Sequence, residues 1–152
     1  MSGLVLRSLE ERDYHGWRPL WDGYNAFYGR SDASALDERV TQQTWGRFFD
    51  PRELVHAIVA EREGHLVGLV HFLYHRSTSR LADVCYLQDL FTDPHCRRQG
   101  VGRALIEQVL EHARAVGASR VYWQTHADNA AGRALYDQLA EHRGFIVYAH
   151  EL

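Results

Sequence analysis

Two arginines, a glutamine and two glycines stand together in the stretch RRQGVGRAL, at residues 97–105. The apolar residues that follow recur at helical spacing, so the stretch predicts a turn at the start of a helix. The first N–H groups of a helix lack partners within it, and the helix dipole adds partial positive charge there. Gly100 and Gly102 let the backbone approach a ligand closely, and the flanking arginines add guanidinium donors. We therefore expect an anion site suited to phosphate or pyrophosphate.

The common nucleotide-binding loops do not fit this turn. A Walker loop requires GxxxxGK[ST], which the sequence lacks. A dinucleotide fingerprint requires a third glycine where Leu105 stands, and an acidic residue about 20 positions further on, where the chain has Arg120. A tight entry into a surface helix, with solvated arginines, is the alternative that the turn alone leaves open.

The elements around this turn predict a mixed α/β fold. Residues 82–92 form a strand that leads into it, and the following helix ends at Gly117. The aromatic stretch 13–28 has helical spacing, and Pro19 fits only the first turn of such a helix. The other expected elements are strands at 4–6, 55–60, 66–74, 119–125 and 144–152, and helices at 37–49 and 129–140.

The composition indicates a single globular domain over residues 1–152. Apolar residues make up 45% of the 152 residues and charged residues 24%, which argues against a disordered, collagen-like or coiled-coil chain. No run approaches the roughly 18 apolar residues of a membrane span, and the N-terminus lacks a secretory signal. The free Cys85 and Cys96 lack CxxC spacing and suit a reducing compartment, so we expect a cytoplasmic protein.

Partners and metals are constrained by charge and spacing. A net charge of −3 provides no general attraction for nucleic acid, and we expect neither nucleic-acid nor membrane partners. His71 and His75 have HxxxH spacing, but they fall in a strand and lack the glutamate of HExxH. We therefore expect no metal.

Four segments resemble the motifs of the GNAT superfamily of N-acetyltransferases. RRQGVG fits its [RQ]xxGx[GA] signature, YLQDLFTDP resembles its central strand, NAAGRALY its NxxAxxLY helix, and GF at 144–145 the close of that motif. Gly132 stands where alanine is usual, and seven residues separate the tyrosine from GF, where about three are common; one more helical turn would absorb most of this insert. The branch it resembles contains yeast-type histone, polyamine and D-amino acid acetyltransferases, and the resemblance is weakest over residues 1–50.

The resemblance implies direct transfer of an acetyl group from acetyl-CoA to an amine in a ternary complex, on the mixed α/β fold of this superfamily. Tyr136 is then the general acid for the CoA thiolate, although alone it would be a core aromatic. Asp89 is the candidate base, with His126 or a water chain as alternatives. The implied acetyl-CoA contacts are Leu90, Phe91, Thr92, Arg97, Arg98, Gln99, Gly100, Val101, Gly102, Arg103, Asn129 and Tyr136. The N–H groups around Leu90 and Phe91 could polarise the thioester carbonyl, and Asn129 could instead cap its helix.

The acceptor site is the least determined part of the sequence. The resemblance places it against the N-terminal helices, so Trp21, Tyr24, Tyr28 and Trp45 could line it with Gln88 and His126, unless the aromatics simply pack against the sheet. A small-molecule amine such as a polyamine or amino acid is the favoured acceptor. A protein lysine acetyltransferase and a non-catalytic acyl-CoA-binding module are the alternatives. The apolar end GFIVYAHEL could pair as an edge strand and suggests a homodimer.

Overall fold

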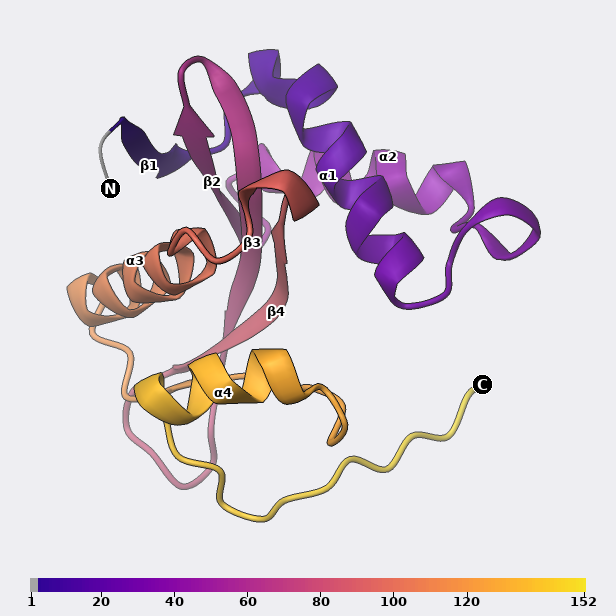
Figure 1. The fold of residues 1–152 in the computed structure, drawn as a ribbon. Coiled ribbons are helices and arrows are strands. Elements are labelled where there is room, and N and C mark those ends of the chain that lie inside the picture. Colours follow the sequence, from indigo (N-terminus) through magenta and orange to yellow (C-terminus); the bar gives the residue numbers. More distant parts are fainter. Residues whose placement is uncertain (1–2) are drawn as a thin grey trace.

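This computed structural model describes residues 3–152. They form a five-stranded sheet flanked by four α-helices (Figure 1). The strand order is β1-β2-β3-β4-β5, antiparallel except for the parallel pair β4 and β5. The expected mixed α/β fold is confirmed. The strands are β1 (Leu4–Ser8), β2 (Val55–Arg62), β3 (His65–His75), β4 (Val84–Thr92) and β5 (Val121–Tyr122), and the helices α1 (Tyr14–Phe27), α2 (Glu38–Phe48), α3 (Val101–Ala115) and α4 (Ala130–Leu139).

Pro19 lies in the second turn of α1, so the expectation that it occupies the first turn was wrong. The helix begins at Tyr14, directly after a 3-10 turn at Glu11–Asp13. In the capping box of that turn, the Asp13 carboxylate accepts the Glu10 backbone N–H at 2.8 Å, and Arg7 donates to the same carboxylate at 2.7 Å. Pro19 and His15 are both exposed, so water can replace the hydrogen bond that the proline cannot donate.

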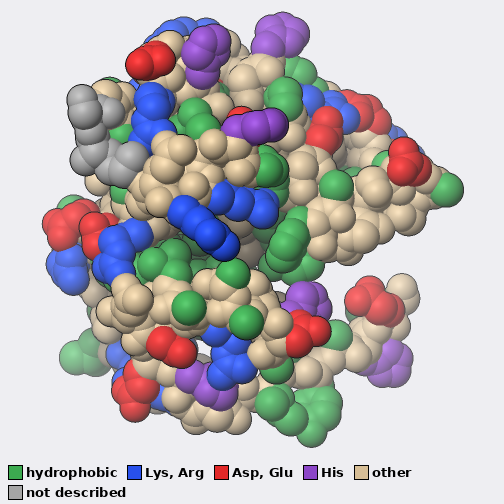
Figure 2. Space-filling view, in the orientation of Figure 1, with side chains coloured by type: hydrophobic (Ala, Val, Ile, Leu, Met, Phe, Trp, Pro, Cys, Tyr) green, Lys and Arg blue, Asp and Glu red, His purple; other side chains and the backbone are tan. Residues whose placement is uncertain are grey.

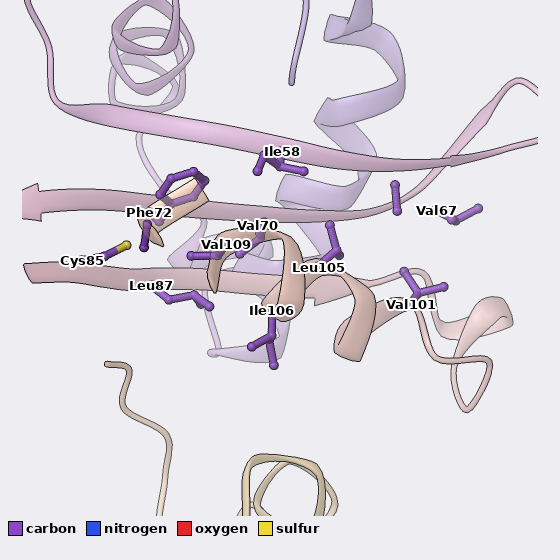
Figure 3. Packing of buried hydrophobic residues seen from close by; sticks show 12 residues of the cluster. Ile58, Val67, Val70, Phe72, Cys85, Leu87, Val101, Leu105, Ile106 and Val109 are labelled. Carbon is purple, nitrogen blue, oxygen red and sulfur yellow. The ribbon is translucent and has the colours of Figure 1, made fainter. Parts of the chain in front are cut away.

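The two faces of the sheet carry separate hydrophobic layers, because side chains alternate along each strand. On β2, Ile58 and Ala60 pack with α3, while Ala57 and Val59 pack with the aromatic residues of α1. Figure 3 shows the first layer, in which Leu105, Ile106 and Val109 of α3 lie over the central strands. The helices α1 and α2 therefore cover one face and α3 the other.

Gly68 on β3 allows the first turn of α3 to lie directly on the sheet. A Cβ atom at this position would stand 2.9 Å from Cγ1 of Val101 and 3.0 Å from Cδ1 of Leu105, closer than carbon atoms pack. The backbone of β3 thus fixes where the helix begins. The RRQGVG turn, which ends at this helix, is placed by the same contact.

Strands β4 and β5 separate after two pairs of residues. Cys85 pairs with Val121 and Tyr86 with Tyr122, and the ladder then ends, although the sequence predicts a strand through residue 125. On its other side β4 carries a bulge at Gln88, because His71 of β3 pairs with Asp89 while the next residue of β3 pairs with Leu87. Because the ladder with β5 ends at Tyr86, the edge of β4 that faces β5 is unpaired from Leu87 onwards.

The expected final strand at 144–152 does not form. Helix α4 continues three residues past Tyr136, and residues 141–152 then run in extended form, outside any sheet and exposed (Figure 1). Phe145 is 85% exposed and Tyr148 89%. Strand propensity is satisfied only by a partner strand, and in this chain β5 offers a ladder of just two residues.

No helix within residues 3–152 combines the length and the apolar content that crossing a bilayer requires.

Candidate active site

A small pocket occupies the opening between β4 and the chain beyond β5. Its walls come from α1, β4, α3, α4 and the segment after β5. Figure 2 shows this face hollowed between the body of the protein and α4, with basic side chains gathered where α3 begins. The residues that line the pocket are Tyr24, Tyr28, Leu87, Gln88, Leu90, Ile106, Trp123, Gln124 and Tyr136.

The RRQGVG turn stands at the start of α3, as the sequence predicts. Arg98 and Gly100 both have positive φ, 63° and 81°, which turns the chain sharply into the helix. The first backbone hydrogen bond of the helix runs from the Ala104 N–H to the Gly100 carbonyl at 3.0 Å. The N–H groups of residues 101–103 precede it, so they are available to an anion.

The side chains of the turn are exposed and partly fixed. The Arg97 guanidinium lies 5.6 Å from the centre of the Phe91 ring, and Gln99 accepts a hydrogen bond from Arg62 at 2.5 Å. Arg103 donates to Gln138 of α4. The turn is thereby tied to β2, β4 and α4 at once.

Tyr136 reaches the pocket from α4. Burial and the neighbouring Tyr28 raise its pKa, so the phenol keeps its proton. Asn129 caps the helix: its Oδ1 accepts the Gly132 N–H at 3.2 Å, and its Nδ2 donates to Thr125 at 2.9 Å. Both polar atoms of the Asn129 side chain are therefore hydrogen-bonded within the protein, and the side chain caps α4.

A buried hydrogen-bonded chain lies behind the pocket. Nδ1 of His71 is 2.9 Å from Oδ2 of Asp89, and Nε1 of Trp17 donates to Nε2 of His71 at 3.1 Å. All three residues are buried, Asp89 being 8% exposed. An indole N–H can only donate, so Nε2 of His71 must be the acceptor. The imidazole proton is therefore on Nδ1, and His71 donates to Asp89.

Tyr24 stands between Asp89 and the pocket. Tyr24 lines the pocket, whereas Asp89 does not. Burial, and then the negative charge of Asp89 and a hydrogen bond to it, raise the pKa of Tyr24. The carboxylate is thus flanked by two donors, His71 and Tyr24, and only the second communicates with the pocket.

The aromatic residues of α1 fall into two groups. Tyr24 and Tyr28 line the pocket, and His126 lies beside Tyr28 with ring centres 5.7 Å apart. Trp21 is buried and donates to Thr41 at 3.0 Å, and Trp45 packs in the aromatic layer under α2. Of the aromatic residues named from the sequence, the structure brings these two tyrosines to the pocket and places the two tryptophans in the layer behind it.

The sequence does not reveal the place of several residues in this region. From the sequence, His71 is a candidate metal ligand only, because its partnership with Asp89 depends on strand register and on the bulge at Gln88. Trp123 and Gln124 line the pocket only because β5 ends before them. Within residues 3–152, no three His, Cys, Asp or Glu side chains are grouped where they could share a metal ion.

Comparison with known proteins gives one family. The model of the Acetyltransferase (GNAT) family matches residues 17–140. The D-amino-acid N-acetyltransferase HPA3 of Saccharomyces cerevisiae is 31% identical over 147 residues, which cover 95% of this chain and 89% of that protein. Two solved structures share the fold. The ribosomal-protein-alanine N-acetyltransferase of Brucella melitensis biovar Abortus has a TM-score of 0.77 at 21% identity, over 98% of this chain and 99% of that one. AAC(6')-Iy in complex with a CoA bisubstrate analogue has a TM-score of 0.81 at 15% identity, over 99% of each chain.

The donor role of His71 is testable by nitrogen NMR of the imidazoles in 15N-labelled protein at pH 8. We expect Nδ1 of His71 to carry the proton and Nε2 to show the shift of an unprotonated nitrogen, because Trp17 occupies it. The His71 signals are identified by their loss in His71→Gln, and the exposed His15 serves as the solvated reference. A proton on Nε2 would contradict the arrangement.

Proposed function

Because the chain belongs to the GNAT family of acetyltransferases, we propose that it transfers an acetyl group from acetyl-CoA to a primary amine of a small molecule within a ternary complex. Residues 1–152 act as one catalytic domain in this proposal. The observation that carries it is the alignment of three features along one opening: the anion-binding turn at α3, the unpaired edge of β4 and the phenol of Tyr136.

The donor site follows from the first two features. Pyrophosphate suits the N–H groups of residues 101–103 and the guanidinium groups of Arg97, Arg98 and Arg103. From there the pantetheine arm passes Thr92 and runs along β4, where residues from Leu87 onwards have free edge groups that pair with amides as a strand would. The N–H groups around Leu90 and Phe91 then polarise the thioester carbonyl.

The acceptor amine must be neutral when it attacks, so it loses a proton before or during the reaction. The neutral amine, which has left its ammonium proton to solvent, hydrogen-bonds to the Tyr24 oxygen. As it attacks, Tyr24 passes its own proton to Asp89 and receives the second proton, which the nitrogen loses as it becomes an amide. The amine nitrogen bonds to the carbonyl carbon, the C–S bond breaks, and Tyr136 protonates the departing thiolate. Solvent returns the proton from Asp89 to Tyr136. His126, beside Tyr28, offers a second route for the amine proton.

One of the relatives supports a small acceptor. The named relative HPA3 is a D-amino-acid acetyltransferase. A protein lysine substrate would need an open groove for its backbone, and a non-catalytic acyl-CoA-binding module would not need Tyr136.

Release of CoA thiol, measured against a panel of polyamines, amino acids of both hands, aminoglycosides and basic peptides, tests this function. The chain contains no lysine, so acetylation of its own lysine side chains cannot mimic turnover. Tight CoA binding without release for any amine would instead support the non-catalytic module.

We further propose a homodimer in which the tail segment, residues 144–152, pairs with a second copy. The segment is extended, apolar and unpaired, and β5 is one of the two edge strands of the sheet. Deletion of residues 144–152 is expected to convert a dimer into a monomer in sedimentation equilibrium. The exposed Leu81→Ser variant is the control and stays dimeric. A full-length chain that sediments as a monomer at micromolar concentration would contradict the proposal.

Gly102→Ala separates ligand contact from folding. A Cβ atom at this position would have no neighbour closer than 3.7 Å, so the unfolding midpoint should not fall. If the backbone here touches the pyrophosphate, CoA affinity drops about tenfold, roughly the loss of one charge-assisted hydrogen bond. Titration calorimetry with CoA measures this, and unchanged affinity would remove the turn from the donor site.

Tyr136→Phe should keep CoA affinity and lower kcat about 10²- to 10⁴-fold, the usual range for loss of a general acid. The mutation removes only the hydroxyl, so packing against Trp123 is retained. Tyr148→Phe, at an exposed position, is the matched control and keeps full activity. Full turnover by Tyr136→Phe would rule out its role as the acid.

A further inference from the structure

Arg30 is held at the side of the pocket by a buried amide. It follows α1, and its Nε donates to Oδ1 of Asn25 at 2.7 Å. Asn25 is 3% exposed and is itself fixed by donation to the Trp21 carbonyl at 2.9 Å. An arginine anchored through Nε presents its outer NH1 and NH2 edge in a fixed direction.

The guanidinium rests against two rings that line the pocket. Its carbon lies 6.0 Å from the centre of the Tyr24 ring and 5.5 Å from that of Tyr28, within the range of cation–π contact. The positive charge also opposes the rise in pKa of both phenols. The charge of Arg30 therefore acts on two residues that line the pocket.

Arg30 has no acidic partner among residues 3–152, since no carboxylate there lies within 4.0 Å of it. Neighbouring arginines differ: Arg18 pairs with Glu38 at 2.7 Å, and Arg39 with Asp37 at 2.7 Å. A half-buried guanidinium that is fixed in place but bound only to an amide retains its capacity for a bidentate anion.

We propose that Arg30 binds the carboxylate of the acceptor, and that the acceptor is an amino acid whose amine faces Tyr24 and Asp89. This proposal rests on the proposed acetyltransferase function and narrows its acceptor class. A molecule with an amine and a carboxylate on the same carbon atom matches a pocket that has a proton acceptor behind one tyrosine and a guanidinium beside it. A polyamine, which carries only positive charge, would be repelled by Arg30.

The test compares amino acids with their own α-amides, which keep the amine and the side chain but lose the negative charge. Alanine, leucine and phenylalanine of both hands, and the corresponding amides, are assayed by thiol release with wild type, Arg30→Met and Arg39→Met. Arg39 is exposed on α2 and serves as the matched control. The quantity of interest is the ratio of kcat/KM for acid over amide.

Wild type and Arg39→Met should favour the best free amino acid over its amide by about ten- to a hundredfold, the value of a charge-assisted pair. In Arg30→Met this ratio should fall to about one through a higher KM for the acid, with the KM for acetyl-CoA unchanged. A ratio that survives in Arg30→Met, or wild type that prefers amides or polyamines, overturns the proposal.

A binding measurement separates this proposal from the acetyltransferase function itself. Lactate of both hands replaces the amine of alanine by a hydroxyl, and its binding to the CoA-loaded protein is followed by tryptophan fluorescence. Binding that is lost in Arg30→Met but kept in Arg39→Met supports the carboxylate site even if no amine is acetylated. Failure of thiol release for every amine would contradict the acetyltransferase function alone, whereas equal lactate binding by all three proteins, or none by any, would contradict the role of Arg30.

Discussion

The early separation of β4 from β5 is the constraint on which the rest of the site depends. A parallel pair that continued beyond Tyr86 and Tyr122 would fill the opening with backbone hydrogen bonds. Because the pair ends there, β4 keeps an unpaired edge from Leu87, and the pocket opens beside it. The bulge at Gln88 then turns Asp89 towards the α1 face of the sheet, where His71 meets it. The unpaired edge of β4 and the position of Asp89 are thus consequences of one irregular strand.

Charge is placed locally in a chain whose net charge is small. The carboxylate of Asp89 is buried but receives hydrogen bonds, which offset the cost of removing it from water. Trp17 makes His71 a donor instead of a competing base. Near the pocket, positive charge is supplied by the turn before α3 and by Arg30. Each group acts at short range, so the orientation of the proposed amino-acid acceptor needs no general electrostatic field.

Local features could be predicted from the sequence, and features set by register could not. The RRQGVG turn and its helix were predictable because glycine conformation and helical periodicity are local properties. Asn129 as a cap followed from residue type. The pairing of His71 with Asp89 joins residues 18 positions apart through a bulge that no periodicity reveals. For the tail segment the sequence predicts an element that does not form. Its composition favours a strand, but the chain itself supplies no partner strand.

Hydrogen exchange at single amides, with and without saturating CoA, tests the central claim most directly. If the donor lies along the opening, exchange slows at residues 87–91 of β4 and at 101–103 in the turn, and little elsewhere. Protection confined to another hollow, such as the one lined by His56 and His112, or no protection at β4, would contradict this assignment of the donor site.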